Sequence, residues 1–157
     1  MSKCCFCIAH PTSAIGIAIT DFLLAAVVIA SAIIVWAADQ FHHTWFWVWS
    51  VVCLANGGIF LISAVLSLFA GLIKERAAAR MCAMLASTGH GLLTVSSLGG
   101  GILSVINILE EDIFDKGEWT VTVSVVAGIS AHVIGVIVGV HFAIVMFGFS
   151  KYAKKNL

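Results

Sequence analysis

Residues 12–37 read TSAIGIAITDFLLAAVVIASAIIVWA, and Asp21 is the only charged residue in this stretch. A helix needs about 20 predominantly apolar residues to cross the hydrocarbon core of a bilayer, and this stretch is longer. Three further apolar segments of similar length follow at residues 45–73, 81–109 and 119–149. Their apolar character is continuous, whereas strands of a membrane barrel alternate over short segments. The sequence therefore predicts four membrane-spanning helices.

The composition of the whole chain agrees with this prediction. Of its 157 residues, 61% are hydrophobic and 10% are charged, and the mean hydropathy is +1.11. Soluble domains carry about 45–50% apolar and about 25% charged residues. Eight basic residues balance eight acidic ones, so there is no basic field for nucleic acid. We predict one all-α domain, a polytopic membrane protein built as an antiparallel four-helix transmembrane bundle.

The charged residues separate by side if the four helices alternate in direction. One side then holds most of the basic residues, namely Lys3, Lys74, Arg76, Arg80, Lys151, Lys154 and Lys155. The other side is acidic and also holds all five tryptophans, which we expect to form an interfacial belt: Trp36, Trp45, Trp47, Trp49 and Trp119. Cytoplasmic loops of membrane proteins are rich in Lys and Arg, so both termini are predicted to be cytoplasmic.

Three ionisable residues are predicted to reach the same depth inside the bundle. Asp21, His90 and His141 each lie about 15 Å along a helix from the predicted cytoplasmic boundary. Ionisable residues within membrane spans usually face the bundle interior and pair with one another. Three interpretations remain open for a cluster of these residues: hydrogen bonding that holds helices together, proton or cation handling, and haem ligation by His90 and His141. We predict neither a metal site nor a required cofactor, and haem b is kept as the alternative.

Small residues recur in the fourth span at Ala131, Gly135 and Gly139. Such four-residue spacing lets helix backbones approach closely. The stripe is predicted to pack against another span of the chain or against a helix of another protein.

The third span contains three consecutive glycines, Gly99, Gly100 and Gly101. Each glycine lowers helix propensity by about 1 kcal/mol relative to alanine. We therefore expect a kink or local unwinding there, or a close helix crossing.

Three cysteines, Cys4, Cys5 and Cys7, precede the first span on its predicted cytoplasmic side. Cysteines beside a membrane helix are suited to S-palmitoylation. The Cys-Cys-Phe-Cys spacing does not match the separated pairs of a structural zinc site.

The two ends of the chain resemble those of a known family. Cys-Cys-Phe-Cys before a span that opens with Thr12 and Ile15, and the ending Ser150-Lys151-Tyr152 with the polar residues after it, are similar to the lysosome-associated four-span transmembrane proteins and their invertebrate tetraspan relatives. The resemblance implies an endosomal, lysosomal or plasma-membrane protein that assists the sorting of other membrane proteins.

Together these features predict a non-enzymatic tetraspan protein that acts as an accessory, assembly or sorting subunit. Its expected partners are the lipid bilayer and either another integral membrane protein or a second copy of the chain. One alternative is a small proton- or ion-coupled channel or transporter subunit that uses Asp21, His90 and His141. Another is a haem-b membrane electron carrier.

Overall fold

The computed structural model describes residues 11–37, 44–111 and 119–156, and these residues are helical except for the link 73–75. The four helices are α1 (Pro11–Ala37), α2 (Thr44–Leu72), α3 (Arg76–Glu111) and α5 (Trp119–Asn156). Each is long and apolar enough to cross a membrane, so the four predicted spans are present as helices.

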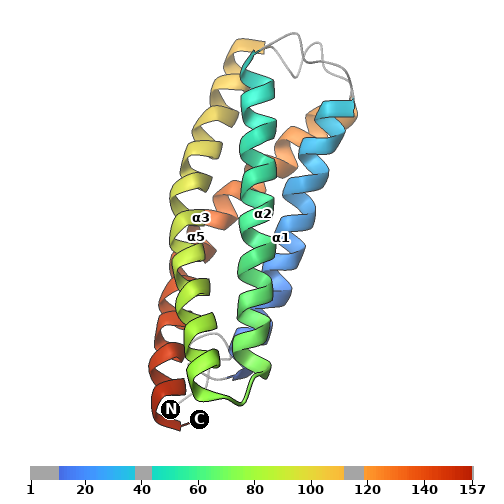
Figure 1. Ribbon diagram of the computed structural model, residues 1–157. Coiled ribbons are helices and arrows are strands. Elements are labelled where there is room, and N and C mark those ends of the chain that lie inside the picture. The colour runs from blue at the N-terminus through green and yellow to red at the C-terminus, as the bar shows by residue number, and fades with distance from the viewer. Residues whose placement is uncertain (1–10, 38–43, 112–118, 157) are drawn as a thin grey trace, which may run out of the picture.

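The four helices run alternately up and down and form a closed ring (Figure 1). Each helix packs against its two neighbours in the order α1, α2, α3, α5, and α5 returns to contact α1. The start of α1, the end of α5 and the link between α2 and α3 all lie at one end of the bundle (Figure 1). Proline at the first position of α1 suits a helix start, because the nitrogen there needs no intrahelical hydrogen bond.

The bundle is apolar on its outward faces, and its interior combines apolar side chains with a set of buried polar ones. One large apolar side chain from each helix illustrates the outward faces: Leu23, Ile62, Val95 and Ile137 are all exposed. The buried polar side chains come from every helix and include Ser13, Asp21, Ser31, Ser50, Asn56, Ser63, Ser67, His90, Ser97, Ser104, Ser124, His132 and Ser150. A water-soluble bundle differs in its outward face, which must be polar because it is wet.

Apolar side chains fill the space between these polar ones. Trp49, Phe60 and Leu93 belong to one buried cluster, and Phe142 and Met146 belong to a second cluster nearer the chain ends. Many of the remaining buried residues are Ala, Ser or Gly, which allow the helices to lie close together.

The described basic residues gather at one end of the bundle, as the charge pattern predicts. Lys74, Arg76 and Arg80 lie in the α2–α3 link and the first turns of α3, and Lys151 and Lys154 lie in the last turns of α5. All five are exposed.

The predicted tryptophan belt needs one correction. Trp36, Trp47 and Trp119 are exposed, but Trp49 is only 1% exposed and points into the bundle. Two residues along a helix turn the side chain by about 200°, so Trp47 and Trp49 face opposite directions. The indole Nε1 of Trp49 donates a hydrogen bond to Ser104 Oγ at 2.7 Å. The side chain of Trp45 lies outside the described residues.

Helix α3 also differs from expectation, because it continues without a break through Gly99, Gly100 and Gly101. Tertiary packing overrides the low helix propensity of this triplet. A Cβ on Gly100 would lie 2.8 Å from Nε2 of His132, so this position is filled by a side chain from α5. The absence of a side chain at Gly100 thus makes room for the imidazole of His132.

Candidate functional site

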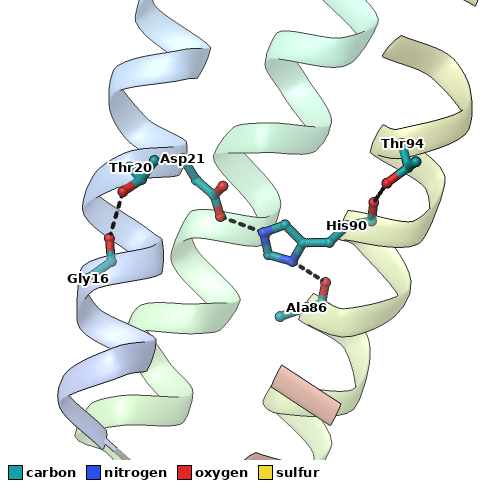
Figure 2. A network of polar contacts seen from close by, with 6 residues as sticks. All are labelled: Gly16, Thr20, Asp21, Ala86, His90 and Thr94. Atoms are coloured by element: carbon teal, nitrogen blue, oxygen red, sulfur yellow. Dashed lines mark hydrogen bonds and ion pairs between the residues drawn. The ribbon is translucent and has the colours of Figure 1, made fainter. Parts of the chain in front are cut away.

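The most chemically distinctive feature of the interior is a pair formed by Asp21 of α1 and His90 of α3. Both side chains are fully buried, and His90 Nε2 lies 2.9 Å from Asp21 Oδ2. The other ring nitrogen of His90, Nδ1, lies 2.7 Å from the backbone carbonyl oxygen of Ala86. Figure 2 shows the imidazole bridging from its own helix to the carboxyl group of α1.

These contacts fix how many protons the pair holds. A carbonyl oxygen only accepts hydrogen bonds, so His90 Nδ1 must carry a proton and donate it to Ala86. The Nε2–Oδ2 hydrogen bond then contains one further proton. If that proton is on Asp21, both groups are neutral, and if it is on His90, they form a carboxylate and an imidazolium. The net charge of the pair is zero in both cases, which limits the penalty of burying it in an apolar medium.

Neighbouring groups hold this pair in place. Phe142 of α5 packs its ring edge-to-face with the His90 imidazole, with centroids 5.5 Å apart. Thr94 donates a hydrogen bond to the carbonyl oxygen of His90, and Thr20 donates one to Gly16 within α1 (Figure 2). Phe142 therefore restrains the imidazole of His90, and Thr94 contacts its backbone. The pair itself connects α1 and α3, which lie diagonally opposite each other in the bundle.

Not every polar atom near the pair is satisfied. Within the described part of the chain, Asp21 Oδ1 and the hydroxyl group of Ser63 are buried without a hydrogen-bond partner. Ser63 lies against the turn of α3 that carries His90, because a Cβ on Gly89 would clash with its hydroxyl. This level of the bundle thus has hydrogen-bonding capacity beyond the pair itself.

A second polar cluster surrounds His132 of α5. Asn56 Nδ2 and Cys53 Sγ, both from α2, lie 3.4 Å from His132 Nδ1 and Nε2 respectively. The Asn56 amide and the Cys53 thiol thus lie against the two ring nitrogens of His132. His132 packs against Gly100, which is ten residues from His90 in α3, so the two clusters are about 15 Å apart along the bundle.

Cysteine, histidine and asparagine are also the catalytic side chains of papain-like proteases. That chemistry needs a thiol that reaches a substrate, and the side chain of Cys53 is fully buried. The arrangement instead connects α2 to α5 by interhelical hydrogen bonds, which polar side chains commonly provide in membrane bundles. Asn56, Cys53 and His132 therefore form a polar contact between α2 and α5 that is separate from the Asp21–His90 pair.

The structure places His141 away from the buried pair. His141 is exposed on α5, while the adjacent Phe142 points inward to His90. The predicted three-residue cluster is therefore a pair of Asp21 and His90. These side chains also do not fit a haem held by two histidines, because both nitrogens of His90 already have partners and His141 faces outward.

The small residues of α5 pack within the chain. Ala131, Gly135 and Gly139 are all buried. A Cβ on Gly135 would lie 2.9 Å from Ser97 Oγ, and one on Gly139 would lie 2.6 Å from Thr94 Oγ1. Of the two predicted alternatives, the structure shows the stripe against α3.

Two predicted features remain to be placed. Cys4, Cys5 and Cys7 lie outside the described residues, so the acylation hypothesis stays a prediction. Across residues 11–37, 44–111 and 119–156, no group of three or more His, Cys, Asp or Glu side chains is arranged to hold a metal ion.

No protein family, curated protein or solved structure shows a significant match to the chain.

Proposed function

We propose that the chain is a multi-pass integral membrane protein that acts without catalysis, as an accessory, assembly or sorting subunit bound laterally to another membrane protein. The observation that carries this proposal is the outward apolar face of all four helices, combined with buried polar side chains on every helix. The helices are joined by only the short segments 38–43, 73–75 and 112–118. Most of the surface that a partner can contact is therefore the flank of the bundle.

The orientation follows from the charges. The end that carries Lys74, Arg76, Arg80, Lys151 and Lys154 is assigned to the cytoplasm, because basic residues near membrane spans favour that side. Both termini are then cytoplasmic. The resemblance of the chain ends supports a plasma-membrane or endolysosomal location, where a sorting role would operate.

Site-specific crosslinking from the flank tests the lateral-partner proposal. A photoreactive residue is introduced in turn at Leu23, Ile62, Val95 and Ile137, one outward position on each helix. A lateral subunit should crosslink to one membrane protein of defined mass from one or two adjacent helices and not from the others. A buried position, Ala32, serves as the control that should give no intermolecular product.

Two results would contradict the proposal. One is crosslinking to lipid alone from all four flanks, with the gently extracted protein migrating at the mass of a single chain. The other is recovery of the protein in the soluble fraction after alkaline extraction of membranes. Substitutions at Gly135 and Gly139 do not test partner binding, because both glycines pack against α3 of the same chain.

A second candidate function is proton- or ion-coupled transport, and the Asp21–His90 pair favours it. An ionisable pair that holds one exchangeable proton deep in a membrane bundle is a typical element of proton relays. Liposomes containing the purified protein and an internal pH dye would report flux after a pH step. Asp21→Asn and His90→Gln should abolish such flux, whereas the exposed-site control His141→Gln should retain it. Equal flux and equal pH dependence in all four proteins would leave the pair a structural role.

A further inference from the structure

Four exposed basic side chains gather at one end of the seam along which α3 and α5 pack against each other. This seam cluster consists of Arg76, Arg80, Lys151 and Lys154. Ser87 of α3 donates a hydrogen bond to the carbonyl oxygen of Ala143 of α5 at 2.8 Å, which fixes how the two helices are aligned. The helices run in opposite directions (Figure 1), so residues before Ser87 lie level with residues after Ala143. Residue 80 is therefore level with about residue 150, and residue 76 with about residue 154.

The two arginines of the seam cluster lie on the side of α3 that faces α5. Seven residues make about two helix turns and eleven make about three, so side chains at these spacings point in nearly the same direction. Arg80 comes seven residues before Ser87, and Arg76 comes eleven residues before it. Since Ser87 contacts α5, both arginines point toward the seam.

The two lysines approach the seam from α5. Lys154 comes eleven residues after Ala143, the residue that Ser87 contacts. Lys151 holds its Nζ 4.4 Å from the ring centroid of Phe147, which is one turn nearer to Ala143. Packed helix axes are about 8–10 Å apart, and residues four positions apart differ in height by about 6 Å. The four cationic groups therefore surround one small area of the surface.

No carboxylate balances the seam cluster within residues 11–37, 44–111 and 119–156. The acidic side chain described at this end, Glu75, lies in the link from α2, and none of the four cations forms an ion pair with a described residue. Arg76 opens α3, and no acidic residue lies in the first turn of this helix. The amino end of a helix carries partial positive charge, so it disfavours a cation and favours an anion. The preference of basic residues for the cytoplasmic side explains their end of the bundle, but not their gathering at one seam.

An apolar groove of about 360 Å³ begins beside Arg80. It continues over Met81, Met84 and Leu85, and Ala77 also lines it. Because α3 starts at the basic end of the bundle, the groove leads from Arg80 toward the middle of the helix. This arrangement fits a molecule with an anionic head and apolar chains, whereas a soluble phosphate compound would leave the groove unused.

We propose that the seam cluster binds the headgroup of a phosphoinositide with at least two ring phosphates, whose acyl chains lie along the groove below Arg80. Arginine binds phosphate through two parallel hydrogen bonds, and lysine binds it as a point charge. Four unpaired cations around one small area match several phosphates better than the single net negative charge of phosphatidylserine. Basic clusters at the cytoplasmic ends of membrane helices are typical of binding to anionic lipids. The inference rests on the membrane placement proposed above and not on the lateral partner.

Native mass spectrometry of the full-length protein in mild detergent measures lipid binding directly. The protein is titrated with dioleoyl phosphatidylinositol 4,5-bisphosphate and, in parallel, with dioleoyl phosphatidylserine and with the soluble headgroup inositol 1,4,5-trisphosphate. The phosphoinositide should bind about 25-fold more tightly than phosphatidylserine, because it contacts about two more basic side chains and each contributes about fivefold. The soluble headgroup should bind at least about tenfold more weakly than the lipid, because it has no chains to cover the apolar groove.

Two seam variants and one matched control test the assignment. Arg80→Gln and Lys154→Gln each remove one charge, one from each helix, and should each weaken phosphoinositide binding about fivefold. Lys74→Gln removes the same charge from the same end of the bundle, but Lys74 lies in the link between α2 and α3, away from α5. Its effect should be less than about twofold. Arg80→Lys should bind with intermediate affinity, because it keeps the charge but loses the paired hydrogen bonds.

All three substituted side chains are exposed, so the variants should fold, and circular dichroism and gel filtration check this. If one seam variant does not fold, the other decides. The inference is overturned if Lys74→Gln weakens binding as much as the seam variants, because the attraction would then be spread over the whole basic end. It is also overturned if phosphatidylserine or the soluble headgroup binds as tightly as the phosphoinositide.

These outcomes are separate from those of the proposed function. The measurement is made in detergent and needs no partner protein, so loss of lipid binding with retained lateral crosslinking would leave the proposed function intact. Recovery of the protein in the soluble fraction after alkaline extraction would instead contradict the membrane placement itself.

Discussion

Replacing both members of the Asp21–His90 pair with leucine is expected to destabilise the bundle less than the two single replacements combined. His90→Leu leaves a buried carboxylic acid without a partner, and Asp21→Leu leaves the ring nitrogen without one. An unsatisfied buried polar group costs about 1–3 kcal/mol, whereas replacing both partners with apolar groups of similar shape is nearly neutral. With about 1.5 kcal/mol for each single and about 1 kcal/mol for the double variant, the coupling is about 2 kcal/mol. This value is slightly above the largest hydrogen-bond coupling typical of membrane bundles, about 1.7 kcal/mol.

The free energies of unfolding would be measured by equilibrium unfolding in mixed micelles with an increasing fraction of dodecyl sulfate. Far-ultraviolet circular dichroism would monitor the loss of helix. The matched control combines His90→Leu with His132→Leu. These histidines belong to clusters about 15 Å apart and should be additive within about 0.5 kcal/mol. If the Asp21→Leu and His90→Leu effects are equally additive, the two side chains do not share a hydrogen bond and the proton count given for the pair is wrong.

Two further predictions use the same unfolding measurement. Gly100→Ala should destabilise the protein by about 1–3 kcal/mol, because its Cβ would overlap the His132 ring, whereas Gly99→Ala should stabilise it by up to about 1 kcal/mol through helix propensity. Equal effects at the two glycines would contradict the packing of His132. Trp49→Phe should cost about 1 kcal/mol, since it removes the hydrogen bond to Ser104, and the same substitution in a Ser104→Ala background should cost measurably less. An unchanged cost in that background would show that the indole is held by packing alone.

Hydropathy predicted the number and approximate positions of the helices, but not where they end. The third span was expected at residues 81–109, and α3 begins at Arg76. The fourth was expected at residues 119–149, and α5 continues to Asn156. The length of an apolar run in the sequence indicates only the part of a helix that lies in the hydrocarbon core. The helix itself continues into the headgroup region, where its residues are polar and basic. The additional turns carry Arg80, Lys151 and Lys154, which the hydropathy criterion excludes.

Depth within the bundle was readable from the sequence, but rotation about each helix axis was not. Counting residues placed Asp21, His90 and His141 at one level, and the first two do meet there. One residue along a helix rotates the side chain by 100°, so an error of one position exchanges His141 for Phe142 at the centre of the bundle. The buried Trp49 illustrates the same limit, because the expected interfacial belt depended on depth alone.

The glycines explain how buried polar side chains fit between closely packed helices. Several of them lie opposite a polar or large side chain from a neighbouring helix: Gly89 opposite Ser63, Gly100 opposite His132, Gly128 opposite Trp49, Gly135 opposite Ser97 and Gly139 opposite Thr94. In each case the space of the missing side chain receives a group that would otherwise hold the helices apart. Small residues in membrane helices are usually interpreted as points of backbone approach. In this bundle they also provide space for polar side chains such as Ser63, Ser97 and His132. These glycines are used within the bundle, so a search for lateral partner surfaces should begin on the outward apolar faces.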